Sequence, residues 1–237
     1  MSDIFKFKQF SINQQNAPFK IGTDGVLLGC WAAKNTNKVN TILDIGTGTG
    51  VIALIMAQRF LNAKVSAVEI NKTAANLAKN NFNQSLWANR IQLIESSLQD
   101  FRPSTRYDII VSNPPYFVNS AISGDRSKDT ARHTLKLDFK AVLHFASNQL
   151  SPGGTLYLVL PFSNKEEIIK KASELGLFPN RICEVLPTPL ASPKRILISI
   201  TNEKSITSFS SLIVEQNVRH QYSNDYKELT KEYYINF

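Results

Sequence analysis

The stretch from Tyr107 to Tyr116 reads Y-D-I-I-V-S-N-P-P-Y, and the fold can be predicted from it. Its apolar centre, Ile-Ile-Val, predicts a short buried strand. The two prolines that follow cannot continue a sheet, because proline lacks an N–H group and fixes φ at about −65°. The strand must therefore stop with the amide of Asn113, the carbonyl of Pro114 and the ring of Tyr116 at its carboxyl end. Ligands of open α/β sheets bind at that edge.

Apolar strands alternate with helical patterns along most of the chain. We expect strands at 41–45, 64–69, 90–94, 107–112, 155–160, 181–187 and 195–201, and helices at 26–33, 51–60, 71–82, 138–150 and 165–176. Ser151-Pro-Gly-Gly is expected to form the turn before the fifth strand. This alternation predicts an α/β fold with a seven-stranded, mostly parallel sheet and helices on both faces, in which the last two strands form an antiparallel pair.

The composition is that of an ordinary globular protein with a basic excess. Hydrophobic residues make up 43% of the 237 residues and charged residues 19%, with a formal net charge of +8. This charge favours a polyanionic partner, RNA or DNA ahead of a membrane surface, although it could also serve solubility alone. Two distant cysteines and three histidines predict neither disulfide nor metal site. Without a signal peptide or an apolar run of about 18 residues, we expect a cytoplasmic protein that binds no membrane. We also expect it to be a monomer.

A glycine-rich segment, Asp44-Ile-Gly-Thr-Gly-Thr-Gly50, follows the first strand of the sheet. Small residues let a ligand approach the backbone at a helix N-terminus, although such turns also occur for packing alone. Val51 replaces the third glycine of a dinucleotide-binding motif, and Asp44 would repel a pyrophosphate, which disfavours an NAD-dependent oxidoreductase. A carboxylate there suits a cationic ligand such as a sulfonium with an ammonium group. Glu69 ends the next strand, where an acid either accepts hydrogen bonds from a ribose or is simply exposed to solvent.

An earlier glycine-containing segment, Ile21 to Gly29, reads I-G-T-D-G-V-L-L-G. It predicts a loop followed by a helix, with Thr23 or Asp24 as the N-cap. Contact of these side chains with a ligand is the alternative to capping.

These features together resemble the class I S-adenosylmethionine-dependent methyltransferases, which have a Rossmann-like fold, and N-P-P-Y is the signature of those that methylate planar nitrogens. The resemblance narrows to the bacterial tRNA adenine-N6 methyltransferases that act on adenosine 37, just 3′ of the anticodon of a valine tRNA. The segments that carry it span almost the whole chain: F-K-F-K-Q-F at 5–10, K-I-G-T-D-G-V-L-L-G at 20–29, L-D-I-G-T-G-T-G at 43–50, I-V-S-N-P-P-Y at 110–116 and Y-S-N-D-Y-K-E-L-T at 222–230.

The resemblance implies S-adenosylmethionine as the cofactor and assigns residues to its parts. It places Gly46, Gly48 and Gly50 beneath the methionine part with Asp44 near the ammonium, Thr23, Asp24 and Gly25 over the same end, Glu69 at the ribose, and Ser97 and Leu98 at the adenine. Many relatives have an acid at the position of Ser97. A hydroxyl accepts a hydrogen bond more weakly than a carboxylate, so we expect this departure to lower cofactor affinity rather than activity.

The chemistry expected at Asn113 follows from the substrate atom. An exocyclic adenine N6 is a poor nucleophile because its lone pair is delocalised into the ring. The side-chain oxygen of Asn113 and the carbonyl of Pro114 can accept hydrogen bonds from both N–H groups of N6. These hydrogen bonds favour a pyramidal nitrogen, whose lone pair then points at the methyl group. Orientation and well-placed acceptors would supply most of the rate. With Pro115 stiffening the turn, Tyr116 would stack on the unstacked base, the alternative being simple packing.

Basic residues outside the motifs are candidates for phosphate contacts. They are Arg126, Lys128 and Arg132, in the long segment without periodicity at 118–134, and the pair Lys194 and Arg195. A solvated charged loop is the equal alternative for each of them. Phe117 would extend the stacking surface or pack. Tyrosines 222, 226 and 233 have helical spacing, which predicts a docking helix rather than a platform for bases.

We therefore expect one methyltransferase domain over residues 1–237, with an N-terminal extension at 1–35 facing cofactor and RNA and a C-terminal extension at 205–237. Its predicted activity is N6-methylation of adenosine 37 of a tRNA, with valine tRNA as the expected substrate. One alternative is a related N-P-P-Y enzyme that methylates a guanine N2 of rRNA or a protein glutamine. The other is an RNA-binding module without turnover, against which the intact Asn113 to Tyr116 and the glycine loop argue.

Overall fold

The computed structural model describes residues 3–33, 38–115 and 137–236. Its strands are β1 (Ile4–Lys6), β2 (Ser11–Asn13), β3 (Thr41–Ile45), β4 (Lys64–Glu69), β5 (Ile91–Glu95), β6 (Tyr107–Ser112), β7 (Leu150–Pro161), β8 (Phe178–Leu186), β9 (Arg195–Thr201) and β10 (Ser208–Ile213). Its helices are α1 (Thr23–Trp31), α2 (Val51–Arg59), α3 (Lys72–Asn83), α5 (Phe139–Gln149), the short 3₁₀ helix η1 (Phe162–Asn164), α6 (Lys165–Glu174) and α7 (Asn224–Thr230).

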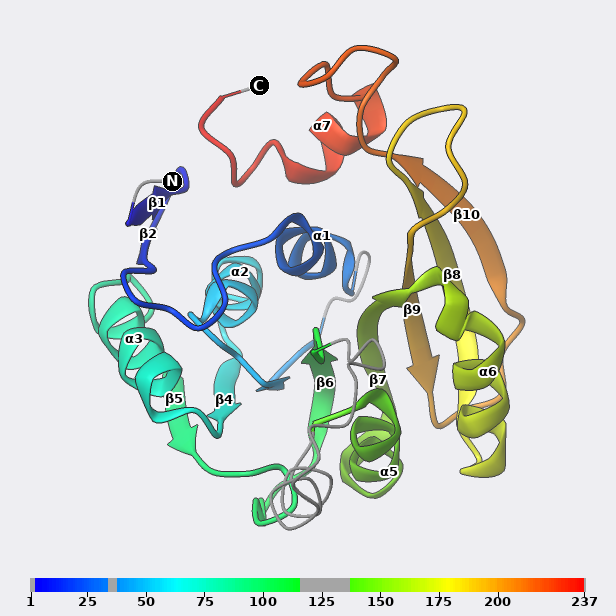
Figure 1. The fold of residues 1–237 in the computed structure, drawn as a ribbon. Coiled ribbons are helices and arrows are strands. Elements are labelled where there is room, and N and C mark those ends of the chain that lie inside the picture. The colour runs from blue at the N-terminus through cyan, green and yellow to red at the C-terminus, as the bar shows by residue number, and fades with distance from the viewer. Residues whose placement is uncertain (1–2, 34–37, 116–136, 237) are drawn as a thin grey trace, which may run out of the picture.

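The described part contains a sheet in the strand order β10-β8-β9-β7-β6-β3-β4-β5 (Figure 1). In that sheet only β9 runs antiparallel to its neighbours. The mostly parallel α/β fold is thus confirmed, and so is the antiparallel pairing of β8 with β9. β3 and β6 pair at the centre, each with a neighbour on its other side, so both are buried from two sides as their apolar sequences predict.

Two details of the predicted sheet are wrong. An eighth strand, β10, pairs in parallel with the edge of β8. Its sequence, S-F-S-S-L-I, has Leu212 as its one buried residue and lacks the apolar run by which the other strands were found. The expected turn at 151–154 is instead part of β7, which begins at Leu150 and passes through a register shift opposite Tyr107.

The helices cover the two faces of the sheet as separate layers. α1, α2 and α3 pack on one face, where Ile109 and Val111 of β6 point into the core. α5 and α6 pack on the other face, toward which Ile110 points. This alternation along β6 is the two-residue period of a strand, so β6 contributes side chains to the core on both faces of the sheet.

The two chain ends pack together on the α1 side of the sheet (Figure 1). Phe7 forms an isolated bridge with Tyr234, and the N–H of Lys8 donates to the carbonyl of Tyr233 at 2.8 Å. The ring of Phe7 stacks on Phe10 at 4.5 Å and lies 5.8 Å from that of Tyr234. The N-terminal arm is therefore a short hairpin, β1 with β2, held by aromatic packing.

Candidate functional site

The carboxyl edge of the sheet brings the Asn113 tip and the glycine loop side by side. Ile45 of β3 pairs in register with Ser112 of β6 and with Val68 of β4. The buried hydroxyl of Ser112 donates to the carbonyl of Ile45 at 2.8 Å, which fastens the two strands at their last residues. Gly46 and Asn113 are the next residues of their strands, so the loop and the tip start from the same row.

The glycine loop adopts a backbone that only glycine tolerates easily. Gly46, Gly48 and Gly50 have φ values of 70°, 58° and 92°. A Cβ on Gly50, the N-cap of α2, would lie 2.4 Å from the ring of Phe82, so packing also requires glycine there. A Cβ on Gly48 would meet no described atom within 4 Å. Gly48 is therefore the glycine of the loop whose backbone a ligand can approach from an open side.

Asp44 lies completely buried beneath the loop. Its Oδ2 accepts hydrogen bonds from the hydroxyl of Thr47 at 2.6 Å and from the N–H of Ala53 at 3.1 Å, which ties the loop to the first turn of α2. Burial raises the pKa of Asp44 to about 7, and the nearby charge of Glu69 adds to this effect. Its Oδ1 has no hydrogen-bond partner in the described chain, so a donor is missing from this buried position.

Glu69, at the end of β4, is 8% exposed and holds two backbone groups. Its Oε2 accepts from the N–H of Gly48 at 2.9 Å and its Oε1 from the N–H of Asn71 at 2.8 Å. Asn71 in turn caps α3 by accepting from the N–H of Ala74, as its place in the sequence predicts. The carboxylate thus faces the glycine loop and is not the solvent-exposed acid of the alternative interpretation.

Ser97 and Leu98 follow β5 at the same edge and are buried. The hydroxyl of Ser97 donates to Oδ2 of Asp100 at 2.6 Å and accepts from the N–H of Asp100 at 3.0 Å. The carboxylate of Asp100 therefore lies next to Ser97, although Ser97 itself is not an acid. The sequence interpretation missed Asp100, because its relation to Ser97 depends on the turn between them.

The first turn of α1 lies between the Asn113 tip and Arg195, the first residue of β9. The predicted N-cap at Thr23 or Asp24 is wrong: Gly22 occupies that position without a side-chain hydrogen bond, and both residues lie within the helix. A Cβ on Gly25 would lie 3.3 Å from Val51 and 4.0 Å from the side-chain nitrogen of Asn113. Asp24 is instead held at 2.8 Å by the Nε–H of Arg195, its ion-pair partner 171 residues away.

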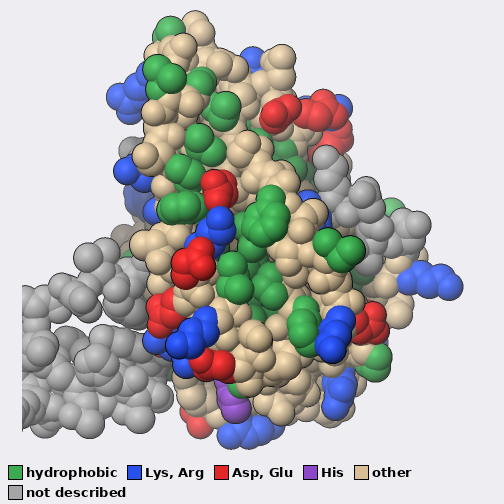
Figure 2. Space-filling view, turned by 90° about the vertical axis from the view of Figure 1, so that its right-hand side faces the viewer, with side chains coloured by type: hydrophobic (Ala, Val, Ile, Leu, Met, Phe, Trp, Pro, Cys, Tyr) green, Lys and Arg blue, Asp and Glu red, His purple; other side chains and the backbone are tan. Residues whose placement is uncertain are grey.

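A pocket of about 840 Å³ opens on the Asp24 side of α1. It brings together residues expected at the cofactor and residues expected at RNA phosphates, namely Thr23 and Asp24 with Lys194 and Arg195. Both chain ends contribute to its wall. Figure 2 shows the neighbouring face formed by β8, β10 and α6, where acidic and basic side chains are interspersed, so that face is not a uniformly basic surface.

The described part of the tip ends at Pro115. Asn113 is half-buried, Pro114 is buried and Pro115 is exposed. The other residues expected to contact the substrate lie outside the described residues; they are Tyr116, Phe117, Arg126, Lys128 and Arg132. Within the described ranges, no group of three metal-ligating side chains is gathered, and no helix has the length and apolarity to cross a membrane.

Asn81 of α3 is a further site residue that the sequence analysis missed. It is 1% exposed, and its Nδ2 donates to the carbonyls of Asn13 at 3.1 Å and Thr49 at 2.9 Å. Its Oδ1 accepts from the N–H of Asn13 at 2.9 Å. One side chain thereby joins the N-terminal arm to the glycine loop. A polar residue on the buried face of an amphipathic helix is the signal by which it could have been found.

Known structures share the fold at low sequence identity. A predicted O-methyltransferase from Agrobacterium tumefaciens has a TM-score of 0.68 at 21% identity, covering 89% of this chain and 96% of that one. The glycopeptide N-methyltransferase MtfA, solved in complex with S-adenosylmethionine, has a TM-score of 0.56 at 12% identity, covering 78% of this chain and 90% of that one.

Relatives of known name match nearly the whole chain. Proteins named tRNA1(Val) (adenine(37)-N6)-methyltransferase are 44% identical in Bacteroides fragilis, over 98% of this chain and 97% of that protein, and 39% identical in Vibrio campbellii, over 98% and 95%. Residues 19–174 match the family described as methyltransferase small domain. The chain therefore belongs to the methyltransferase small domain family and, within it, to the bacterial tRNA1(Val) (adenine(37)-N6)-methyltransferases.

Proposed function

We propose that this protein transfers a methyl group from S-adenosylmethionine to N6 of adenosine 37, beside the anticodon of a valine tRNA. The observation that carries the proposal is the register of β3 with β6, which starts the glycine loop and the Asn113 tip from one row of the sheet. A nitrogen held at the tip then lies next to a ligand held on the loop. The names of relatives about 40% identical over nearly their full length support the same reaction.

The residues of the loop fit such a cofactor. S-adenosylmethionine supplies a methyl group on a positively charged sulfonium. The unpartnered Oδ1 of Asp44 suits a cationic donor, and the open side of Gly48 admits a ligand. Glu69 would accept from the ribose hydroxyls, and Ser97 and Leu98 would border the adenine. Gly25, beside Asn113, would cover the methionine end, whereas Thr23 and Asp24, also expected there, line the pocket beside α1. The interaction of Asp100 with Ser97 places a carboxylate where the hydroxyl alone would be a weak acceptor.

Asn113 and Pro114 would bind and orient the substrate nitrogen. Their oxygens would accept hydrogen bonds from the two N6 N–H groups, so that the nitrogen becomes pyramidal and its lone pair is available. The new N–C bond forms as the methyl–sulfur bond breaks, and the nitrogen then loses one proton to water. No strong base is needed, because the proton becomes acidic only as the bond forms. The half-buried setting of Asn113 limits competition from water, while Tyr116 would stack on the base.

We further propose that the whole chain acts as one monomeric domain in the cytoplasm. The contacts between its two ends support one unit rather than a domain with loose extensions. The net charge of +8 favours tRNA as the partner, with Lys194 and Arg195 near the tip and Phe117, Arg126, Lys128 and Arg132 as further candidates.

The reaction is tested with purified protein, labelled S-adenosylmethionine and total tRNA that lacks the modification, followed by nucleoside analysis by mass spectrometry. N6-methyladenosine next to a valine anticodon is the expected product. Label found in guanosine N2 of rRNA, or in a protein glutamine, with none in tRNA, would overturn the choice of substrate while keeping the tip chemistry.

The role of the tip is tested by Asn113→Ala. We expect turnover to fall at least ~100-fold, the scale of losing a preorganised polar contact, while binding of S-adenosylmethionine is kept. Asn148→Ala is the matched control, because Asn148 is an exposed asparagine near the start of β7, at the opposite edge of the sheet. Equal turnover of the two variants would exclude the proposed mechanism.

A further inference from the structure

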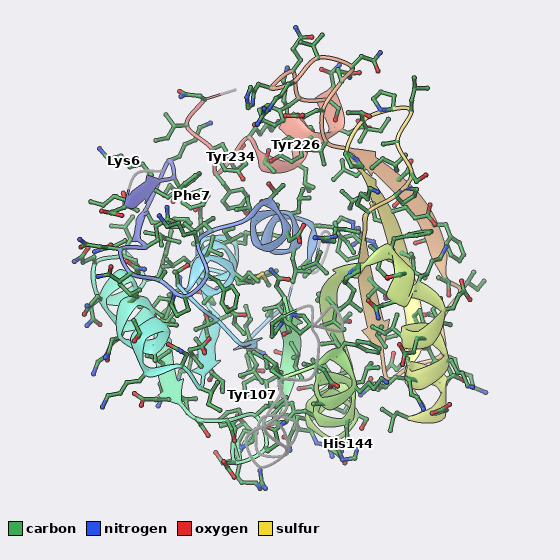
Figure 3. All side chains as sticks on the ribbon, viewed as in Figure 1. Lys6, Phe7, Tyr107, His144, Tyr226 and Tyr234 are labelled. Carbon is green, nitrogen blue, oxygen red and sulfur yellow. The ribbon has the colours of Figure 1, made fainter. Side chains whose placement is uncertain are left out.

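The pocket of about 840 Å³ beside α1 has a wall that belongs to neither the glycine loop nor the tip. It is formed by both chain ends, by the first turn of α1 and by the facing ends of β8 and β9. Its volume is within the range of sites that enclose small molecules, and it is large enough for a base with its sugar and phosphate. Figure 3 shows Lys6 and Phe7 from the N-terminal arm beside Tyr226 and Tyr234 from the C-terminal segment.

One wall of the pocket is aromatic and rigid. The ring of Tyr222 stacks on that of Tyr226 at 5.0 Å with an interplanar angle of 18°, and Tyr226 lies 6.5 Å from Tyr234 at 26°. Tyr226 is buried, Tyr222 and Tyr234 are half-buried, and all three line the pocket. The ring of Tyr226 thus covers one face of the ring of Tyr222. The docking helix expected from the sequence therefore contains Tyr226 but neither Tyr222, which precedes α7, nor Tyr233, which follows it. Nucleic-acid-binding proteins use stacked aromatic rings as platforms for bases.

The residues that line the pocket include cations that suit a phosphate. Lys194 and Lys6 are exposed there, and Arg195 is oriented by its ion pair with Asp24 at 2.8 Å. Glu215 also lines the pocket, where its Oε1 accepts from the N–H of His220 at 3.0 Å. Three cations against two carboxylates leave a positive excess, and the carboxylates are acceptors for the N–H groups of a base.

The pocket adjoins the candidate active site through one helical turn. Asp24 faces the pocket, whereas the next residue, Gly25, faces Val51 and Asn113. β9 begins at Arg195, which pairs with Pro161 of β7, three residues beyond the row that contains Ser112 and Leu158. The pocket therefore lies beyond the same edge from which the tip projects.

We propose that this pocket binds a nucleotide of the RNA near the methylated adenosine, with its base stacked on Tyr222 and its phosphate held by Lys194 and Arg195. The proposal rests on the proposed function, because it assumes that an RNA substrate lies at the tip. It gives the two chain ends a role in choosing the substrate, since the aromatic wall forms only where they meet.

The test is a mutant cycle with RNA that carries single abasic sites. Binding of an anticodon stem-loop of valine tRNA is measured by fluorescence anisotropy without cofactor, for the intact RNA and for variants with an abasic site at each loop position except the target. At one position, wild-type protein should lose about tenfold in affinity. With intact RNA, the affinity of Tyr222→Ala should be lower than that of the wild type by the same factor. With the RNA that is abasic at that position, the variant should lose no further affinity, because the ring and the base that would stack are no longer both present.

Two further variants keep the test decisive if Tyr222→Ala folds poorly. Tyr222→Phe retains the ring and should bind as the wild type does, and Lys194→Gln should reduce the slope of log K against log salt by about 1. Phe209→Ala and Lys170→Gln are the matched controls, because both residues are exposed and line no part of the pocket. Controls should leave affinity and slope at wild-type values.

The outcomes separate this proposal from the methyl transfer itself. If Tyr222→Ala binds every RNA as the wild type does, or loses affinity equally for all abasic positions, the pocket is not a base site. If a position-specific loss appears but no methyl group is transferred to tRNA, the pocket stands and the proposed reaction is wrong. If methyl transfer occurs without any position-specific loss, the reaction stands and the pocket proposal is wrong.

Discussion

A single buried carboxylate, Asp44, makes the stability of the protein depend on pH. Burial raises its pKa from 3.8 to about 7, so the folded protein binds the proton more tightly than the unfolded chain. Its contribution to the free energy of unfolding is therefore complete below about pH 4 and is lost as the pH rises through about 7. Asp44→Asn removes this titration. Urea denaturation should show a wild-type decline that is steeper by on the order of 1 kcal/mol per pH unit between about pH 5 and 7.

Other ionisable groups are common to the two proteins and cancel in the difference between their pH profiles. Parallel profiles for wild type and Asp44→Asn would contradict the raised pKa.

The sequence predicts that Asp44 ends a strand directly before the glycine loop. It does not predict that the carboxylate is buried, because the burial depends on the hydroxyl of Thr47 and the N–H of Ala53, which donate to the carboxylate. The partner of Asp24, Arg195, is 171 residues away and leaves no local pattern, so capping was predicted in place of an ion pair.

Helix α3 connects the N-terminal arm to the glycine loop through Asn81. Asn81→Ala removes three hydrogen bonds, a buried one to Thr49 and two part-buried ones to Asn13, and leaves their backbone partners without this side chain. At about 1 kcal/mol for each bond, we expect the free energy of unfolding to fall by roughly 2–3 kcal/mol. Asn80→Ala, at the exposed neighbouring position, should stay within about 0.5 kcal/mol of wild type in the same urea titration. Equal losses in the two variants would show that the connection carries no stability.

Elements with a strong local pattern could be predicted, and those defined by distant partners could not. β3, β4 and β6 are apolar runs followed by turn residues, and their common edge follows from the rule for parallel sheets. β10 has one buried side chain and becomes a strand only because β8 offers it an unpaired edge. The start of β7 contains Pro152 and Gly153, which indicate a turn in isolation, but pairing across a register shift keeps them in the sheet.

At the scale of the whole molecule, the two chain ends contact each other although they are more than 220 residues apart in the sequence. The Nζ of Lys8 donates to the carbonyl of Lys231 at 2.6 Å. The rings of Phe5 and Phe7 contact that of Tyr234, and the ring of Phe10 stacks on Phe7. The resemblance of both ends to one family was visible in the sequence. Their contact was not, because it joins segments that are far apart in the chain and share no local pattern.

This contact predicts that a destabilising substitution in the N-terminal arm also reduces the protection of α7 against hydrogen exchange. Phe7 is 4% exposed, so Phe7→Ala should cost about 3–5 kcal/mol where the arm packs. If the ends form one cooperative unit, hydrogen exchange should accelerate in α7 as well, for example at the N–H of Tyr226, which donates to Ser223. Phe19→Ala is the control, because Phe19 is 77% exposed in the same arm and should leave α7 protected. Faster exchange of the arm with unchanged protection of α7 would mean that the ends are independent, and the pocket between them would then lack the rigid wall that base stacking requires.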